Sequence, residues 1–297
     1  MRRLSQIALL CIALCAAIYS HAANADISFE KQVLLASIQN RESEERGTAL
    51  YVRVDTEISG PAAGFIVPGA RKGDSYRQTN SYEWWVRDQQ VAVATLRKSS
   101  STLDGVKIVS TEEEEGIGFV YTYDGSRNYL LDFRQDGAVL EIGTKWPYAG
   151  SACPPLFGRA YNSTPYSELM SSGFDLVRTE SLKGSACQVV DIPISDHAFV
   201  RSWLSPENDY LSVKEEYHTA SGVAITREYE FSRDGSGPLL PVGAVEIFRA
   251  ARGNELRTDW RFTAAKTDPQ LPAYIFTPPS SLATVVIDRL AGNSGEN

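Results

Sequence analysis

The chain has 297 residues, of which 43% are hydrophobic, and its formal net charge is −8 at pH 7. This acidic balance disfavours a nucleic acid or an anionic membrane surface as partner, because both attract patches of Lys and Arg. A chain of this length can bury a large core, and no low-complexity linker divides it, so we expect one large β domain.

The first 25 residues have the pattern of a secretory signal peptide. Residues 1–3 give a basic start, residues 7–18 form an apolar run, and Ala23-Asn24-Ala25 fits an Ala-x-Ala cleavage site. The run is short for a membrane span, which disfavours an uncleaved anchor. We expect residues 1–25 to be removed, leaving a periplasmic or secreted protein that starts at Asp26.

Two cysteines remain after cleavage, Cys153 and Cys187. An even pair in an exported protein usually forms a disulfide, so we predict this one; the alternative is two separate buried thiols. No matching His or Cys lies at ligand spacing, so we expect no metal site.

Residues 28–46 predict an amphipathic helix. Ser28 can cap its start, Gly47 can end it, and Phe29, Val33 and Ile38 fall on one face together with Leu34. The apolar stripe of this helix must cover another element, and the apolar face of a sheet is the obvious candidate.

Most of the remaining chain alternates with a period of two, as strands do when one face is covered and the other is wet. We expect strands at 48–58, 75–86, 91–96, 105–109, 117–123, 127–133, 138–142, 174–181, 187–194, 199–204, 210–218, 223–231, 243–250, 256–264 and 274–277. Asp124-Gly125 and Asp136-Gly137 are strong hairpin signals. The predicted fold class is α+β and mostly β: a single curled antiparallel sheet of about 11 strands, an unclosed β-barrel, with helices packed on its concave face.

Four segments interrupt this pattern. Segment 59–69 has an apolar centre and is either an edge strand packed inward, which we favour, or a flap over an apolar site. The acidic run 112–115 is better explained as a hairpin tip than as a calcium site, because adjacent carboxylates cannot all converge on one ion. Segment 144–172 is an irregular, proline-rich insert with a short helix after Pro165, and residues 291–297 are expected to be a disordered tail.

The sequence offers no positive sign of catalysis. His197 and His218 lie in or beside ordinary strands, and no nucleophile elbow, zinc-binding helix or phosphate-binding loop occurs. Scattered carboxylates could form a hydrolase pair, but the sequence places no two of them at a working separation. We therefore expect a protein that is not an enzyme and has no cofactor.

Aromatic side chains are concentrated in the predicted strands. Core packing is the simpler interpretation of each one, but a curled sheet that its helices do not fill could leave a cavity. The candidates for lining such a ligand-binding cavity are Phe29, Val33, Trp84, Tyr121, Trp203, Tyr229, Phe231 and Trp260.

Three motifs carry a resemblance to a known family: Trp203–Tyr217 (WLSPENDYLSVKEEY), Arg227–Phe231 (REYEF) and Tyr274–Pro279 (YIFTPP). With the order of the elements, they resemble the LolA-like periplasmic lipoprotein carriers, which include LolB and the N-terminal domain of RseB. Ser205 stands where the family has Asp, and Ser212 where it has Pro. The resemblance implies a half-barrel over residues 26–290, with helices as a lid around an apolar cavity for acyl chains.

These observations favour an exported, non-catalytic carrier or sensor, active in transport within the cell envelope. Its partner would be a lipid or an acylated protein such as a lipoprotein, and we expect a monomer. The alternative is a structural or protein-interaction module of the cell envelope, with an envelope protein as partner and a core filled by its own side chains. A carboxylate-dependent hydrolase is the third interpretation.

Overall fold

Alternation of apolar and polar side chains produces one large sheet. Its strands are β1 (Ala49–Pro61), β2 (Ser75–Arg87), β3 (Gln90–Leu103), β4 (Val106–Ser110), β5 (Ile117–Tyr123), β6 (Asn128–Arg134), β7 (Gly137–Ile142), β10 (Asp175–Leu182), β11 (Ser185–Ser195), β12 (Ala198–Ser205), β13 (Leu211–Thr219), β14 (Gly222–Arg233), β15 (Leu239–Arg249), β16 (Glu255–Thr267) and β17 (Val285–Asp288). The structure, a computed structural model, describes residues 29–61, 73–88, 90–103, 106–110, 117–134, 137–143, 158, 160–161, 164–233, 239–249, 255–267, 271 and 275–290.

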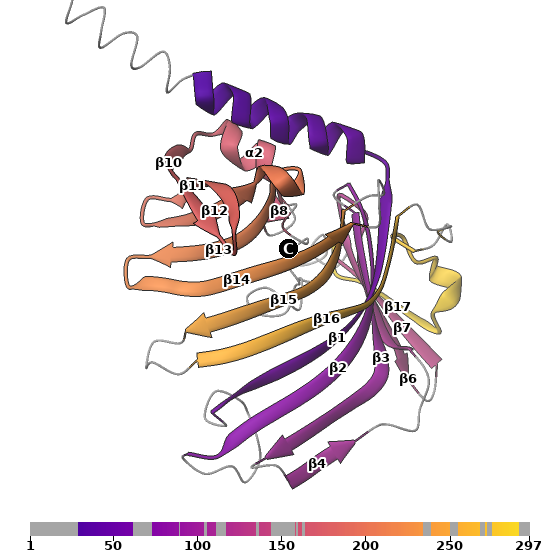
Figure 1. Ribbon diagram of the computed structural model, residues 1–297. Coiled ribbons are helices and arrows are strands. Elements are labelled where there is room, and N and C mark those ends of the chain that lie inside the picture. The colour runs from indigo at the N-terminus through magenta and orange to yellow at the C-terminus, as the bar shows by residue number, and fades with distance from the viewer. Residues whose placement is uncertain are drawn as a thin grey trace, which may run out of the picture.

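The sheet is continuous, curled and unclosed (Figure 1). Its strands follow the order β10-β11-β12-β13-β14-β15-β16-β1-β2-β3-β5-β6-β7-β17, with β4 paired to β3. The predicted mostly-β fold is confirmed, with 15 strands rather than about 11. These strands correspond to 14 of the 15 ranges expected above, and β17 adds a parallel strand beside β7 at the far edge.

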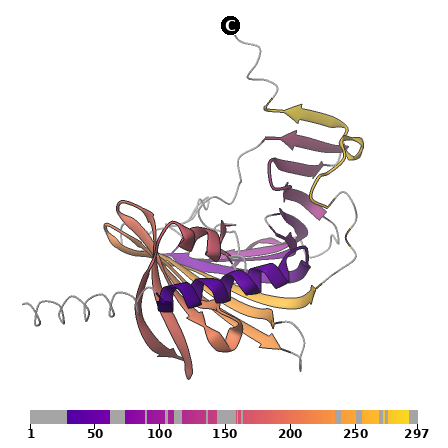
Figure 2. The ribbon, with the colours of Figure 1, turned by 90° about the horizontal axis from the view of Figure 1, so that it is seen from above.

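Two helices pack against one face of the sheet, which we call the inner face. The N-terminal helix (29–45) ends before Gly47, whose positive φ terminates it, and α2 (Tyr166–Ser171) follows Pro165 as predicted. The helix side chains Leu34 and Ile38 are buried in one cluster with Tyr166, Met170, Val190, Ile192 and Leu204. Figures 1 and 2 show the N-terminal helix lying over the β10–β13 end of the sheet, so the prediction of helices on the concave face is confirmed.

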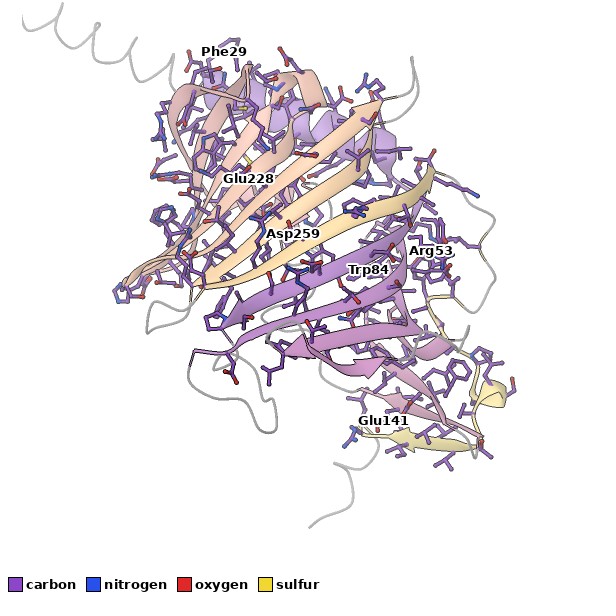
Figure 3. The ribbon with its side chains drawn as sticks, turned by 60° about the horizontal axis from the view of Figure 1, so that its bottom comes forward. Phe29, Arg53, Trp84, Glu141, Glu228 and Asp259 are labelled. Atoms are coloured by element: carbon purple, nitrogen blue, oxygen red, sulfur yellow. The ribbon has the colours of Figure 1, made fainter. Side chains whose placement is uncertain are left out.

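The opposite, outer face of the main sheet is charged. Its ion pairs join residues two apart on one strand or opposite on neighbouring strands, for example Arg257 with Asp259 and Arg201 with Asp191. Figure 3 shows Glu228 and Asp259 on this side. Charge on one face and apolar side chains on the other is what the period-two pattern predicts.

The arm formed by β5, β6, β7 and β17 reverses this pattern. Its core consists of Tyr129, Leu131, Ala138 and Leu140, with Ala283 packed against it. Tyr121 of β5 lies opposite Val93 of β3, so Tyr121 is on the inner face. The strand registers place the core side chains of the arm on the other face of the sheet. The arm and the main sheet therefore bury different faces. Figure 2 shows the arm projecting away from the main sheet.

The remaining predictions vary in outcome. The predicted strand at 274–277 is wrong for residues 275–277, which form bends between prolines, with Phe276 buried. Short 3₁₀ turns occur at η2 (Pro206–Asn208) and η3 (Ser280–Leu282), and β8 (Ala160–Tyr161) pairs with β9 (Thr164–Pro165) within the insert. The signal peptide, most of segment 59–69, the acidic run and the tail lie outside the described residues.

Candidate functional site

The inner face carries an apolar cluster that spans six neighbouring strands, from β14 through β15, β16, β1 and β2 to β3. Its members are Leu50, Val52, Val54, Trp84, Val91, Val93, Tyr229, Ala244 and Trp260. We call this set the inner-face cluster. Every one of these side chains comes from the sheet, and neither described helix contributes to it. Five strand spacings make it about 24 Å wide.

Two tryptophans give the inner-face cluster an unusual polar feature. Trp84 and Trp260 are 1% and 4% exposed, and the indole Nε1 of each is buried without a hydrogen-bond acceptor. A buried donor without a partner costs about 1–3 kcal/mol, so such groups are rare unless something else satisfies them. The cluster therefore combines buried apolar side chains from six strands with two buried donors that have no acceptor.

A belt of buried charge separates the inner-face cluster from the helix-covered end of the sheet. Arg227 Nε donates to Glu246 Oε2 at 2.6 Å, and Arg227 Nη1 lies 3.7 Å from Glu215 Oε2. The hydroxyls of Tyr229 and Tyr166 both donate to Glu215, the first at 2.9 Å. We call these five residues the inner polar belt.

Burial sets the protonation of the belt. It raises the pKa of Glu215 and of Glu246, although Arg227 opposes both shifts. Burial alone would lower the pKa of Arg227, but Tyr229, Glu246 and Glu215 hold it above its ordinary value. Burial and the neighbouring Glu215 raise the pKa of both tyrosines well above the usual range, so they remain hydrogen-bond donors. The belt is internally paired and leaves little charge for a ligand.

The helix-covered end is fixed by specific contacts. Glu42 of the N-terminal helix accepts from the backbone N–H of Ser167 at 3.2 Å and from its hydroxyl. Arg41 Nη1 donates to the carbonyl of Tyr210 at 3.2 Å. Tyr166 of α2 ties the same assembly to the polar belt. Both helices are thus attached to the sheet at one end of the inner face.

The predicted cavity residues fall into three groups. Trp84, Tyr229 and Trp260 belong to the inner-face cluster, with Phe231 packed against it, and Tyr121 is buried on the same face of β5. These five therefore lie on the same, inner face of the sheet.

Phe29 and Val33 lie elsewhere. They are 64% and 46% exposed and line a separate hollow of about 410 Å³ between the N-terminal helix and β10. Trp203 is on the outer face, in a cluster with Cys187 and Val189, and Lys214 Nζ lies 4.3 Å from its ring centre. Because the sheet stands between them, Trp203 cannot line one cavity with the inner-face residues.

A larger hollow, of about 610 Å³, lies on the outer face. Its lining includes Asp55, Glu57, Glu228 and Asp259, and Lys183 makes an ion pair with Glu228 at 3.2 Å. This charged lining suits water and ions rather than an acyl chain.

Cys187 is a free, buried thiol in the structure, and burial raises its pKa. The structure therefore shows no disulfide at Cys187, where the Cys153–Cys187 bond was predicted. The thiol points to the outer-face cluster and donates to the carbonyl of Ser185, whereas the insert reaches the sheet from the inner side, where Gly158 accepts from Ser212 N. Cys153 itself lies outside the described residues.

The described residues contain no group of three or more His, Cys, Asp or Glu side chains arranged to hold a metal ion. Within the same residues, no helix has the length and apolar character needed to cross a bilayer.

Sequence reasoning missed the polar belt. One signal was present: Arg227 occupies an inward position of β14, between the apolar Ile225 and Tyr229. A charged residue in the apolar register of a strand indicates a buried partner. The partners Glu215 and Glu246 come from neighbouring strands, and only the strand registers identify them.

No family model and no curated protein matches the sequence. Among solved structures, a DUF1329 family protein from Desulfovibrio piger is similar, with a TM-score of 0.51 and 10% identity, over 84% of this chain and 98% of that chain. A LolA superfamily protein from Nitrosomonas europaea gives a TM-score of 0.47 and 16% identity, over 83% and 96% of the two chains. A putative outer membrane lipoprotein-sorting protein domain from Vibrio parahaemolyticus gives 0.45 and 11%, over 81% and 94%.

These identities are low, so the comparisons bear on the fold alone. The chain therefore shares the overall fold of the DUF1329 family protein from Desulfovibrio piger.

Proposed function

We propose that this protein is an exported, non-catalytic carrier or sensor that binds the acyl chains of a lipid or an acylated protein on its inner face. Residues 26–290 would form the binding domain after removal of the signal peptide. The observation that supports the proposal most is the inner-face cluster, which covers six strands and receives no side chain from the described helices.

The chemistry of the cluster suits an acyl chain joined to a carbonyl. Each methylene group that the protein shelters from water contributes on the order of 0.8 kcal/mol to the binding free energy, and this needs no catalytic residue. The unpaired indole donors of Trp84 and Trp260 could bond to ester or amide carbonyls, which are the polar groups nearest to the chains. Arg227 is paired with carboxylates of the polar belt, so a charged headgroup is expected to stay outside.

Tryptophan quenching by lipids with brominated acyl chains tests this proposal. The purified mature protein is mixed with a brominated phosphatidylcholine, and its fluorescence is compared with that of a non-brominated control. Bromine quenches only indoles that it approaches closely, so bound chains should quench Trp84 and Trp260. Trp84→Phe and Trp260→Phe should each reduce the quenched fraction, whereas Trp203→Phe, on the outer face, should leave the quenched signal unchanged.

The same variants test the donors. Loss of one hydrogen bond of about 1.4 kcal/mol corresponds to a tenfold weaker affinity, so each indole-to-phenyl change should weaken binding by up to about that factor. Absence of quenching, together with no lipid in organic extracts of the protein as purified, would overturn the proposal.

The packing at one end of the inner face favours a second candidate, a protein-interaction module. There Leu34, Ile38, Tyr166 and Met170 already fill the space between helices and sheet. If the whole inner face is filled in this way, the protein has no room for a lipid. The quenching experiment separates the two candidates, because only a carrier brings bromine close to the inner-face tryptophans.

A further inference from the structure

The far edge of the sheet is apolar and exposed. The described residues have ten exposed large hydrophobic side chains, and half of them lie within nine residues around β17: Leu282, Val285, Val286, Ile287 and Leu290. All four residues of β17 are exposed. Apolar patches of this kind on a soluble domain usually mark an interaction site.

The backbone of β17 is also open on one side. β17 runs parallel to β7 in the register Val285↔Val139 and is the last strand of the sheet. The N–H of Arg289 donates to the carbonyl of Ile142 at 3.0 Å, as this register requires, so residues 285, 287 and 289 face β7. Because ladder bonds alternate along a strand, Val286 and Asp288 direct their N–H and C=O groups away from the sheet. This edge can accept another strand.

The opposite edge of the sheet is protected. β10 has a bulge between Leu176 and Arg178, and Arg178 makes an ion pair with Glu180. Lys31 of the N-terminal helix pairs with Asp175 at 3.2 Å. Bulges and charges are the usual devices that prevent edge-to-edge pairing. The chain uses them at β10, whereas β17 presents three consecutive apolar side chains.

We propose that β17 pairs edge to edge, antiparallel, with β17 of a second copy of this chain. An antiparallel pair requires outward-facing residues to meet outward-facing residues. The register that places Val285 opposite Ile287 of the partner subunit brings the outward-facing backbone groups of Val286 in the two copies together. This register puts Val286 opposite Val286 on the two-fold axis, and it puts Asp288 opposite Thr284 of the partner subunit.

The strand is therefore complementary to itself. Each contact in this register is apolar with apolar, or carboxylate with hydroxyl, and no like charges are opposed. The interface is isologous, as a two-fold dimer requires, and it closes after two copies instead of continuing as a fibre. The neighbouring ion pair of Arg289 with Glu141 lies within one copy, and Figure 3 shows Glu141 on the arm.

The first test measures the mass of the mature protein in solution by sedimentation velocity over a range of concentrations. We expect a dimer for the unmodified protein and a monomer for Ile287→Lys, which places a charge beside the two-fold axis, opposite Val285 of the partner subunit. Val177→Lys is the matched control, because Val177 is exposed to the same extent, 40%, on the protected edge. It should leave the dimer intact. Circular dichroism establishes that both variants are folded.

The second test fixes the register and does not depend on how the lysine variant folds. In the proposed pairing Val286 meets its own copy at a hydrogen-bonded position, with Cα atoms about 5.5 Å apart, a separation that a disulfide spans. Val286→Cys should therefore give a covalent dimer under mild oxidation. Val285→Cys should not, since Val285 faces Ile287. The unmodified chain, which contains Cys153 and Cys187, is the background control.

The outcomes are decisive. A mass of one chain at all concentrations would overturn the proposal, and so would a dimer that Ile287→Lys leaves intact. Equal cross-linking of the two cysteine variants would overturn the register. None of these results depends on lipid binding, so the experiments test the dimer independently of the proposed function.

Discussion

Removing the guanidinium from the inner polar belt should destabilise the protein strongly. Arg227→Met keeps most of the side-chain volume but leaves Glu246, 2.6 Å away, and Glu215, 3.7 Å away, without a cation. All three side chains are less than a tenth exposed. Breaking a buried ion pair from one side costs about 3–5 kcal/mol, which is a large part of the total stability of about 5–15 kcal/mol of a typical domain.

The loss should depend on pH. Burial raises the pKa of both carboxyls above their unfolded value, and without Arg227 the pKa should rise further. The cost of burying their charge is therefore fully present above the folded pKa and disappears as the pH falls towards the unfolded pKa of about 4.3. The difference between Arg227→Met and the unmodified protein should be largest near neutral pH and should shrink on acidification.

Urea unfolding followed by tryptophan fluorescence, near neutral pH and again at mildly acidic pH, measures this difference. Arg257→Met is the control, because its ion pair with Asp259 lies on the outer face with both side chains 40% exposed or more, and it should cost less than about 1 kcal/mol. Adding Glu246→Met to Arg227→Met should restore part of the stability. A loss as small as that of the control, or one that does not change with pH, would refute the electrostatic reasoning.

Three further changes test other parts of the structure. Gly158→Ala should lower the free energy of unfolding by about 2 kcal/mol or more, because a Cβ there would overlap a backbone carbonyl of β13. Gly184→Ala is the control: this glycine has a positive φ but lies in open space, so the change should cost only about 1 kcal/mol. Thermal melts compare the two variants. Tyr166→Phe removes a buried hydroxyl that donates to Glu215 and should cost about 1–3 kcal/mol in urea unfolding, and an unchanged midpoint would contradict the contact. Because Cys187 is a free thiol, a reducing agent should not change the melting temperature, and a marked fall would indicate a disulfide after all.

The sequence predicted the elements well where the local pattern decides them. The helix expected at 28–46 occupies residues 29–45, because capping and spacing are properties of neighbouring residues. The strands expected at 199–204, 210–218 and 223–231 are β12, β13 and β14, because turn residues and alternation mark them without reference to the rest of the chain.

The candidate site was predicted less completely because it depends on pairing between distant strands. In residues 199–204 both alternating sets contain apolar and polar side chains, so the sequence does not reveal that Trp203 faces outward. Glu215 and Glu246 are recognisable as buried only once the registers bring them to Arg227. The parallel pairing of β17 with β7 is equally invisible, because no turn connects the two strands.

The arm of β5, β6, β7 and β17 shares a backbone ladder with the main sheet but has its own core on the other face. Strands β6, β7 and β17 can therefore separate from β5 without disturbing the side chains around Trp84, whereas β5 stays with the main sheet through Tyr121. Amide protons of β6 and β7 should then exchange with solvent through a local opening that costs less free energy than global unfolding, while those of β1 and β16 exchange only when the whole domain opens. One continuous sheet would thus behave as two cooperative folding units.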